Sequence, residues 1–419
     1  MAKHTLTDLL QMQSLPLEAK IRMTANRVNG WVNEFGEEGV YVSFSGGKDS
    51  TVLQDIVRNV CGYKRIPSVF VDVPTQYPEL REFATSFENV TILKPKLSFM
   101  DVCKKYGFPL ISKEVSGAVY DARKYLTRVL ESAESVQTDR QTDRQTVRGY
   151  WAFADIAGIP RRKEAYESEQ YKNLQKGIIP NDVCERIIPR EIYQKYKDIY
   201  KPPVRMQMSY GELIHKEKGV PTGEFSKRYD KSKYEFFLSA PFDISDRCCK
   251  VMKKAPLHTF SKETGRLPMT AQMADESELR KSNWIKHGCN GFDMKSPISN
   301  PMSFWTEQDV LQYIKSRKLP ICSVYGEVVI DYEAMGELDG QSFLYLTGNE
   351  PLKTTGCNRT GCMLCGFGCH LEKSPNRFEL LKETHPKMYN LLDVCKNNGV
   401  TFREAIEWTN EHGNLNIKL

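Results

Sequence analysis

The sequence of 419 residues has no long hydrophobic run, no secretory signal and little excess of either charge. No stretch reaches the roughly 18 apolar residues that a membrane-spanning helix requires, so we expect no membrane-spanning segment. The N-terminal segment, MAKHTLTDLLQMQ, lacks the apolar core of a signal peptide, which predicts a cytoplasmic protein. Basic residues outnumber acidic ones by 59 to 53, a balance that permits an acidic partner without requiring one.

The composition is otherwise that of a globular protein with many cysteines. Hydrophobic residues make up 40% of the chain and charged residues 27%, which argues against a disordered, collagen-like or coiled-coil protein. At about 150 residues per domain, the length predicts two or three domains. The twelve cysteines are not expected to form a disulfide framework in a cytoplasmic chain, so reduced thiols, catalysis or metal binding fit them better.

Apolar patterns alternate between helix and strand periods in the first hundred residues. They predict helices at 6–35, 51–60 and 79–87 and strands at 40–44, 66–72 and 90–93. A further strand is predicted at 267–274 and a helix, capped by Thr306, at 305–314. Strands that alternate with helices through short links indicate an α/β fold with a doubly wound, mostly parallel sheet.

Composition and motifs divide the chain into four sections. These are a phosphate-binding part at 1–125, a basic, tyrosine-rich insertion at 126–240, the rest of the α/β domain at 241–356, and a cysteine-rich end at 357–419. The last section includes an amphipathic helical region at 378–398, interrupted at Pro386. The insertion carries a polar repeat at 137–148, interpreted as a surface loop or a solvated helix extension. Its basic residues and tyrosines suit contacts with phosphates and bases, or an ordinary solvated surface.

A glycine-rich loop after the strand at 40–44 is the main candidate site. Its sequence is Ser45-Gly46-Gly47-Lys48-Asp49-Ser50. Paired glycines let the backbone turn sharply and approach an anion, and amides at the start of the next helix would point toward that anion. Lys48 supplies positive charge for a phosphate. Asp49 is unusual beside an anion, and it indicates a bound Mg²⁺ or a role in holding the loop.

This loop resembles the PP-loop of the ATP pyrophosphatases, whose signature is S-G-G-x-D-S, and lacks the wider glycine spacing of a Walker A loop. Further motifs are similar, in the same order, to those of the phosphoadenosine phosphosulfate (PAPS) reductase branch of that superfamily. They are Asp72 followed by Pro78-Glu79, Cys248-Cys249 followed by Lys253 and Pro256-Leu257, Asp275-Glu276-Ser277 with Arg280, Trp305 with Asp309-Val310, and Gly361-Cys362 with Cys365. The resemblance skips roughly 125–240.

The resemblance implies a protein that cleaves ATP between its α- and β-phosphates and attaches AMP to an oxygen atom of its substrate. It implies catalytic roles for Lys48 and Asp49, with Mg²⁺ as a cofactor. The residues that it implies for nucleotide binding are Ser45, Gly46, Gly47, Lys48, Asp49, Ser50, Asp72, Glu276 and Arg280.

Two departures separate this sequence from the reductases of that branch. Those proteins read T-G-x-R before D-E-S, whereas this sequence ends the corresponding segment 270–273 in Met273. The arginine that would hold the sulfate or phosphate is therefore missing. Sulfate and adenosine phosphosulfate (APS) reductases also carry a C-terminal Glu-Cys-Gly nucleophile, and residues 410–419 contain no cysteine. Without that thiolate the covalent S-sulfo intermediate cannot form there.

Closely spaced cysteines form a second candidate site. Cys357, Cys362, Cys365 and Cys369 have the spacing C-x4-C-x2-C-x3-C, and structural zinc sites and iron–sulfur clusters both use four cysteines. The resemblance implies instead a [4Fe–4S] cluster held by Cys248, Cys249, Cys362 and Cys365. Cys362 and Cys365 belong to both ligand sets. Cys357 is the closest rival to the tandem pair, and Zn²⁺ is the alternative metal.

Together these features predict an ATP-dependent, pyrophosphate-releasing sulfurtransferase that acts on a nucleic acid, by tRNA thiolation or DNA phosphorothioation. A sulfur donor such as a cysteine desulfurase would be a partner. Two alternatives stay open. One is a PAPS or APS reductase that makes sulfite, and the other is a nucleotide-binding partner module with a structural metal.

Overall fold

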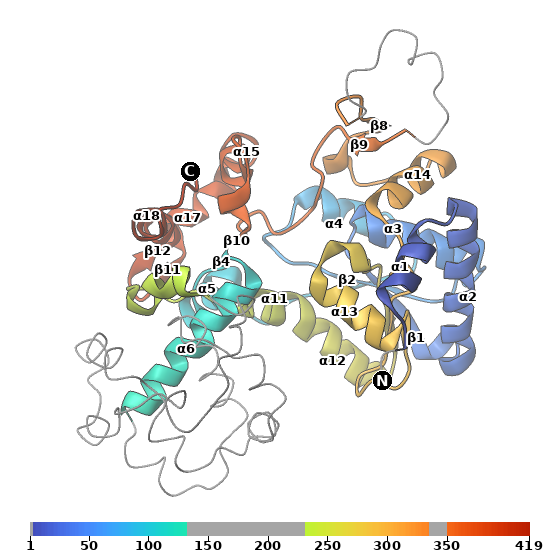
Figure 1. The fold of residues 1–419 in the computed structure, drawn as a ribbon, viewed down its shortest axis with the longest axis horizontal. Helices are drawn as coiled ribbons and strands as arrows, with labels where there is room; N and C mark the ends of the chain where they lie inside the picture. Colours follow the sequence, from blue (N-terminus) through green and yellow to red (C-terminus); the bar gives the residue numbers. More distant parts are fainter. Residues whose placement is uncertain (1–2, 132–230, 335–349) are drawn as a thin grey trace, which may run out of the picture. The chain divides into compact units, whose positions relative to one another are not determined.

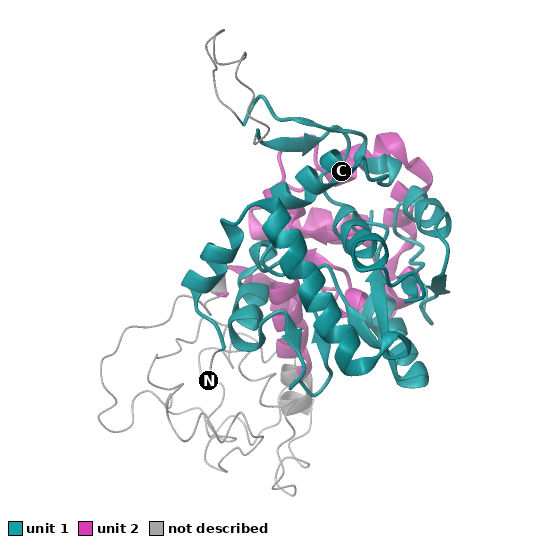
Figure 2. Cartoon of the chain, turned by 90° about the vertical axis from the view of Figure 1, so that its right-hand side faces the viewer, with its two compact units in different colours: residues 1–98, 250–363 teal, residues 99–249, 364–419 magenta. Residues whose placement is uncertain are grey.

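The computed structural model describes residues 3–131, 231–334 and 350–419. Packing divides the chain into two compact units, which Figure 2 shows in teal and magenta. Unit 1 comprises residues 1–98 and 250–363, and unit 2 comprises residues 99–249 and 364–419. The four predicted sections follow composition and motifs rather than packing, and most of the predicted insertion lies outside the described residues. In the described ranges no helix is both long and apolar enough to span a membrane.

The predicted α/β fold with a mostly parallel sheet is confirmed in unit 1 (Figure 1). The six strands, in spatial order, are β3 (Val90–Leu93), β2 (Ser68–Val71), β1 (Val40–Phe44), β5 (Leu267–Met269), β7 (Ile298–Ser299) and β6 (Asn290–Gly291). Every neighbouring pair is parallel except β7 and β6, which are antiparallel. The chain leaves β1 toward β2 on one side and later returns to β5 on the other, so the strand order reverses at β1. In open α/β sheets, ligands bind beyond the carboxyl ends of the strands at such a reversal.

Helices cover both faces of β1 in unit 1. They are α1 (Leu6–Gln13), α2 (Leu17–Phe35), α3 (Lys48–Asp55), α4 (Pro78–Thr85), α12 (Ala255–Thr264), α13 (Glu278–His287) and α14 (Glu307–Arg317). Val40 and Val42 are fully buried in the core that includes Trp31 of α2. Tyr41, between them, points to the opposite face, where its hydroxyl lies 3.2 Å from that of Ser261 in α12. This alternation is the reason that every residue of β1 except Ser43 is buried.

Several element boundaries differ from the prediction. The predicted helix at 6–35 is wrong as a single helix, because α1 ends at Gln13 and α2 begins at Leu17, after Pro16. Proline suits the start of a helix but not its interior. The predicted strand at 267–274 is correct only for its first three residues. The predicted helix at 51–60 begins earlier, at Lys48, and continues after Asp55 as a π-helical turn.

Unit 2 is mainly helical around a cluster of aromatic side chains. Its elements are α5 (Phe99–Tyr106), β4 (Leu110–Ile111), α6 (Lys113–Glu131), α11 (Arg247–Cys249), β10 (Gly366–Phe367), α15 (Arg377–Thr384), α16 (Pro386–Tyr389), α17 (Leu391–Val394), β11 (Lys396–Asn397), β12 (Val400–Thr401) and α18 (Phe402–Gly413). The predicted interruption at Pro386 is confirmed, since α15 ends just before it. Phe108 and Phe402 stack face to face, with ring centroids 4.7 Å apart.

A buried ion pair fixes α14 to α2 in unit 1. Lys20 Nζ lies 2.7 Å from both carboxylate oxygens of Asp309, and the two side chains are 3% and 13% exposed. The same carboxylate accepts the amide of Thr306 at 2.7 Å, in the predicted cap of the helix. Asp309, which belongs to one of the motifs of the resemblance, therefore has a structural role in this chain.

We expect Asp309→Ala to lower the free energy of unfolding by about 3–5 kcal/mol, because it leaves a buried lysine without its counter-charge. The matched control is Glu278→Ala, since Glu278 makes an exposed pair with Lys281 and should change stability by less than about 1 kcal/mol. Urea unfolding of both variants measures the difference. Equal effects would show that the Lys20–Asp309 pair does not anchor α14.

Candidate functional site

The predicted glycine-rich loop follows β1 and runs into α3. Gly46 has a φ of +72°, a left-handed conformation that glycine adopts without strain. A Cβ atom at this position would lie 3.0 Å from the carbonyl oxygen of Leu80, so the loop is also too closely packed for a larger residue. The hydroxyls of Ser45 and Ser50 lie 3.0 Å apart, and Ser50 donates to the carbonyl of Gly47 at 2.9 Å. These bonds hold the turn closed.

The first turn of α3 offers backbone amides to an anion. No side chain caps the helix, which starts at Lys48. The first amides of a helix have no acceptor within the helix, and the helix dipole favours negative charge there. The amide of Lys48 donates to the hydroxyl of Tyr325 at 3.2 Å. The amides of Asp49 and Ser50 follow in this uncapped turn, which fits a phosphate group at the carboxyl end of β1.

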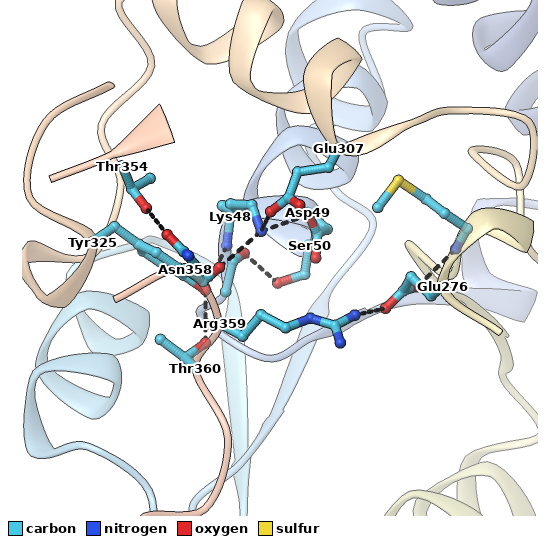
Figure 3. A network of polar contacts seen from close by, with 12 residues as sticks. Lys48, Asp49, Ser50, Glu276, Glu307, Tyr325, Thr354, Asn358, Arg359 and Thr360 are labelled. Carbon is cyan, nitrogen blue, oxygen red and sulfur yellow. Dashed lines mark hydrogen bonds and ion pairs between the residues drawn. The ribbon is translucent and has the colours of Figure 1, made fainter. Parts of the chain in front are cut away.

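Lys48 is the buried cation of the loop, with 4% of its surface exposed. Its Nζ donates to the carbonyl of Asn358 at 3.2 Å and lies 3.0 Å from Oε1 of Glu307 (Figure 3). It also lies 3.7 Å from Oδ1 of Asp49. These three contacts fix the direction of the ammonium group, so the cation is already positioned for a phosphate.

Tyr325 braces the loop from the segment that precedes the cysteine motif. Its hydroxyl lies 2.6 Å from the Thr360 hydroxyl while it accepts the Lys48 amide. A Cβ atom at Gly47 would lie 3.2 Å from the Tyr325 oxygen and 3.4 Å from that of Thr360. Burial raises the pKa of Tyr325, so its hydroxyl stays protonated. The second glycine of the loop is thus needed for the close approach of this segment.

Asp49 has the features of a carboxylate that binds a cation. Its Oδ1 is buried and has no hydrogen-bond partner among the described residues. Burial raises the pKa of Asp49, and Glu307 adds to this effect while Lys48 opposes it. Mg²⁺ is commonly held by one or two carboxylates together with substrate phosphates. Asp49 and Glu307 therefore fit the predicted Mg²⁺, and protonation of Asp49 would compete with its binding.

Two arginines and a glutamate continue the network beside the loop. Glu276 pairs with Arg280, four residues further along. Its other carboxylate oxygen lies 3.2 Å from the guanidinium of Arg359 (Figure 3). Burial lowers the pKa of Arg280, as does the neighbouring Arg359, whereas the charge of Asp49 raises it. The structure therefore places the predicted residues Glu276 and Arg280 in the electrostatic surroundings of Asp49.

Two other positions singled out by sequence lie differently. Asp72 follows β2 and forms its ion pair with Arg81 of α4, at 3.4 Å, rather than with the loop. Met273 is 4% exposed, and its amide donates to the carboxylate of Glu276 at 3.0 Å. The position of the missing arginine is thus occupied by a buried thioether.

The predicted metal ligands are divided between the two units. Cys357 and Cys362 belong to unit 1, and Cys248, Cys249, Cys365 and Cys369 belong to unit 2. Burial raises the pKa of Cys357 to about 11, which favours the protonated thiol. Across the described ranges, no group of three or more histidine, cysteine, aspartate or glutamate side chains is arranged to hold a metal ion. Metal binding by these cysteines stays a prediction.

Sequence reasoning missed the residues that surround the loop from the second half of the chain. They are Glu307, Tyr325, Asn358, Arg359 and Thr360. A signal existed for some of them, because Glu307 lies inside the predicted W-x-x-x-D-V motif. Asn358, Arg359 and Thr360 lie between Cys357 and Cys362, in a segment where the sequence motif points only to the cysteines.

A doubly wound sheet with a glycine-rich loop at the end of β1 is typical of nucleotide-binding α/β proteins. Residues 193–366 match the family described as phosphoadenosine phosphosulfate reductase domain. The match, which covers less than half of the chain, supports the predicted resemblance to the PAPS reductase branch of the PP-loop superfamily. The matched range includes Glu276 and Arg280 but begins after the loop at 45–50, which is assigned by its own sequence and geometry. No curated protein matches the chain.

We expect Gly46→Ala to weaken binding of a non-hydrolysable ATP analogue at least tenfold, because the added methyl group would push the loop away from Leu80. The matched control is Gly265→Ala, since Gly265 also has a φ of +72° but has nothing within 4 Å of the added atom. Both variants should lose about 1–2 kcal/mol of stability from left-handed strain. Equal affinity of the two variants, measured by calorimetry, would contradict the placement of the phosphates.

For the cysteine motif we expect Cys362→Ser to abolish bound metal in protein purified without oxygen. The control is Cys289→Ser, because Cys289 is buried in the core of unit 1 away from the predicted ligand sets. Iron, sulfide and zinc are measured on both variants and on the parent protein. Iron with sulfide supports the cluster, stoichiometric zinc supports the alternative metal, and a metal-free parent protein would refute both.

Proposed function

We propose that the protein is an ATP-dependent sulfurtransferase that releases pyrophosphate from ATP and modifies a nucleic acid. The observation that carries the proposal is the geometry of the loop at 45–50. A left-handed glycine turn, uncapped helix amides and the buried Lys48 meet at the carboxyl end of β1. These three features suit the phosphates of a nucleoside triphosphate.

The first chemical step would transfer AMP to the substrate. An oxygen atom of the substrate attacks the α-phosphorus, the bond to the oxygen bridging the β-phosphate breaks, and pyrophosphate leaves. The amides of the first turn of α3 and the ammonium of Lys48 stabilise the phosphate charge. Asn358 and Glu307 hold the ammonium group of Lys48 at this end of the sheet.

Mg²⁺ would neutralise charge on the leaving pyrophosphate. Asp49 and Glu307 are the carboxylates that would hold the ion, completed by phosphate oxygens and water. The buried Oδ1 of Asp49, which has no hydrogen-bond partner among the described residues, supports this role. Lys48 lies close to both carboxylates, and it would exchange its contact with Glu307 for a phosphate oxygen when the nucleotide binds.

The second step would replace the adenylated oxygen by sulfur. A hydrosulfide-level sulfur nucleophile forms a bond to the atom that carries the oxygen, and AMP leaves with that oxygen. A donor of the cysteine desulfurase type would supply the sulfur as a persulfide. A second thiol would give the two electrons that bring it to the hydrosulfide level, and that thiol would end as a disulfide with the donor cysteine. The excess of lysine and arginine and the interleaved tyrosines at 159–240 support a nucleic-acid substrate.

Met273 supports this function over reduction of PAPS. Its buried thioether cannot pair with a sulfate or phosphate group, whereas an arginine at this position could. The family match itself favours the reductase as the second candidate. A nucleotide-binding module without turnover is the third, and the three differ in the product that forms.

We expect Asp49→Asn to reduce pyrophosphate release by about 100-fold or more, since the neutral amide cannot hold Mg²⁺ beside the phosphates. The control is Asp275→Asn, an exposed aspartate in the same motif as Glu276. Release is measured with ATP alone and with added tRNA or DNA. Stimulation by nucleic acid supports the proposal. Sulfite formed from PAPS would favour the reductase, and ATP binding without release under every condition would favour the binding module.

A further inference from the structure

A cavity of about 180 Å³ lies beside the loop network in unit 1. Its walls come from the residues that follow β5 and β7 and from one face of α13. Arg280, Asn283, Trp284 and His287 line it at the spacing of successive helical turns. Arg280 also belongs to the network around Asp49, so the cavity and the nucleotide loop share this residue.

The lining mixes polar and apolar groups and carries no acidic side chain. Side-chain amides come from Gln272, Asn283 and Asn300, and soft apolar surface comes from Met273 and Met294. With Arg280 as its charged residue, the cavity suits a neutral or anionic ligand and disfavours a cation. Amide groups read the edges of heterocyclic bases by paired hydrogen bonds, and thioether and aromatic surfaces contact their faces.

Two residues that line the cavity, His287 and Asn300, have polar groups suited to hydrogen-bond a ligand. Nδ1 of His287 is buried and has no hydrogen-bond partner among the described residues. Oδ1 of Asn300 accepts the hydroxyl hydrogen of Thr270, an arrangement that orients the amide and makes its NH₂ group the donor for a ligand. A buried nitrogen without a hydrogen-bond partner is costly, so His287 favours a hydrogen-bonding ligand at this site.

The volume limits the size of this ligand. Pockets for larger organic ligands usually measure about 300–1,000 Å³, and this cavity is smaller. It therefore fits one ring system rather than a whole nucleotide. Trp284, which is 3% exposed, forms a rigid wall, and its other face stacks on His4 with a centroid distance of 4.6 Å.

We propose that this cavity binds the nucleobase of the acceptor that the enzyme adenylates. Asn283, Asn300 and His287 would contact the edge of the base, and Arg280 would adjoin the side nearest Asp49. This inference rests on the proposed function and specifies its substrate class. The base comes from either a free nucleotide or a single strand with an extruded nucleotide, and enzymes that modify bases commonly take them out of the stack.

The test uses the full chain loaded with a non-hydrolysable ATP analogue and Mg²⁺. Binding of the four nucleoside monophosphates, and of single-stranded oligonucleotides of each base, is measured by equilibrium dialysis. At least one base should bind with one-to-one stoichiometry while the analogue stays bound. Binding of the monophosphate identifies a free nucleotide as sufficient, and binding of the oligonucleotide alone identifies a nucleic acid as the source.

Two variants test the cavity itself. We expect Asn283→Leu and His287→Phe each to weaken base binding at least tenfold, because they remove a hydrogen-bonding group and keep the side-chain size. The control is Asn33→Leu, an exposed asparagine on α2. Affinity for the ATP analogue is measured on every sample and reports that unit 1 is folded.

The outcomes separate this inference from the proposed function. Loss of base binding whenever the analogue is present, or unchanged base binding in both variants, would overturn the cavity assignment even if pyrophosphate is released. Specific base binding without pyrophosphate release from ATP would support the cavity as a base site. It would contradict the proposed transfer of AMP, and the bound base could then not be the acceptor.

Discussion

The left-handed turn at Gly46 is the constraint on which the rest of the site depends. It ends β1, starts α3 without a side-chain cap and lets the loop lie against Leu80. Lys48 follows at the first helical position and is directed inward because of this turn. If the backbone entered α3 by another path, the amides and the ammonium would no longer face the same point beyond the sheet.

The charges around the loop balance one another. The cations are Lys48, Arg280 and Arg359, and the carboxylates are Asp49, Glu276 and Glu307. A network of this kind keeps each charged group oriented without a large net field. A polyphosphate that entered alone would disturb the balance, whereas one accompanied by a divalent ion changes it less. The balance of charge is therefore consistent with the proposed binding of a nucleotide together with Mg²⁺.

Local patterns were sufficient to predict the strands at 40–44 and 90–93, the cap at Thr306 and the glycine loop, because each depends on residues close in sequence. The partners of Lys48 could not be predicted, since Tyr325 and Asn358 lie 277 and 310 residues away along the chain. Only the folded sheet brings them to the loop. Asp72 is the opposite case. Its spacing in the motif fits the resemblance, which implies nucleotide binding, but its side chain pairs with Arg81 in the folded chain.

The cysteine motif lies next in sequence to the residues that hydrogen-bond to the glycine-rich loop. The carbonyl that holds Lys48 belongs to Asn358, the residue directly after Cys357, and Thr360 lies two residues before Cys362. Alkylation, oxidation or ligation of either sulfur would displace this short stretch of backbone and so redirect the ammonium group. The chemical state of these thiols and the position of the Lys48 ammonium group therefore depend on the same short segment of chain.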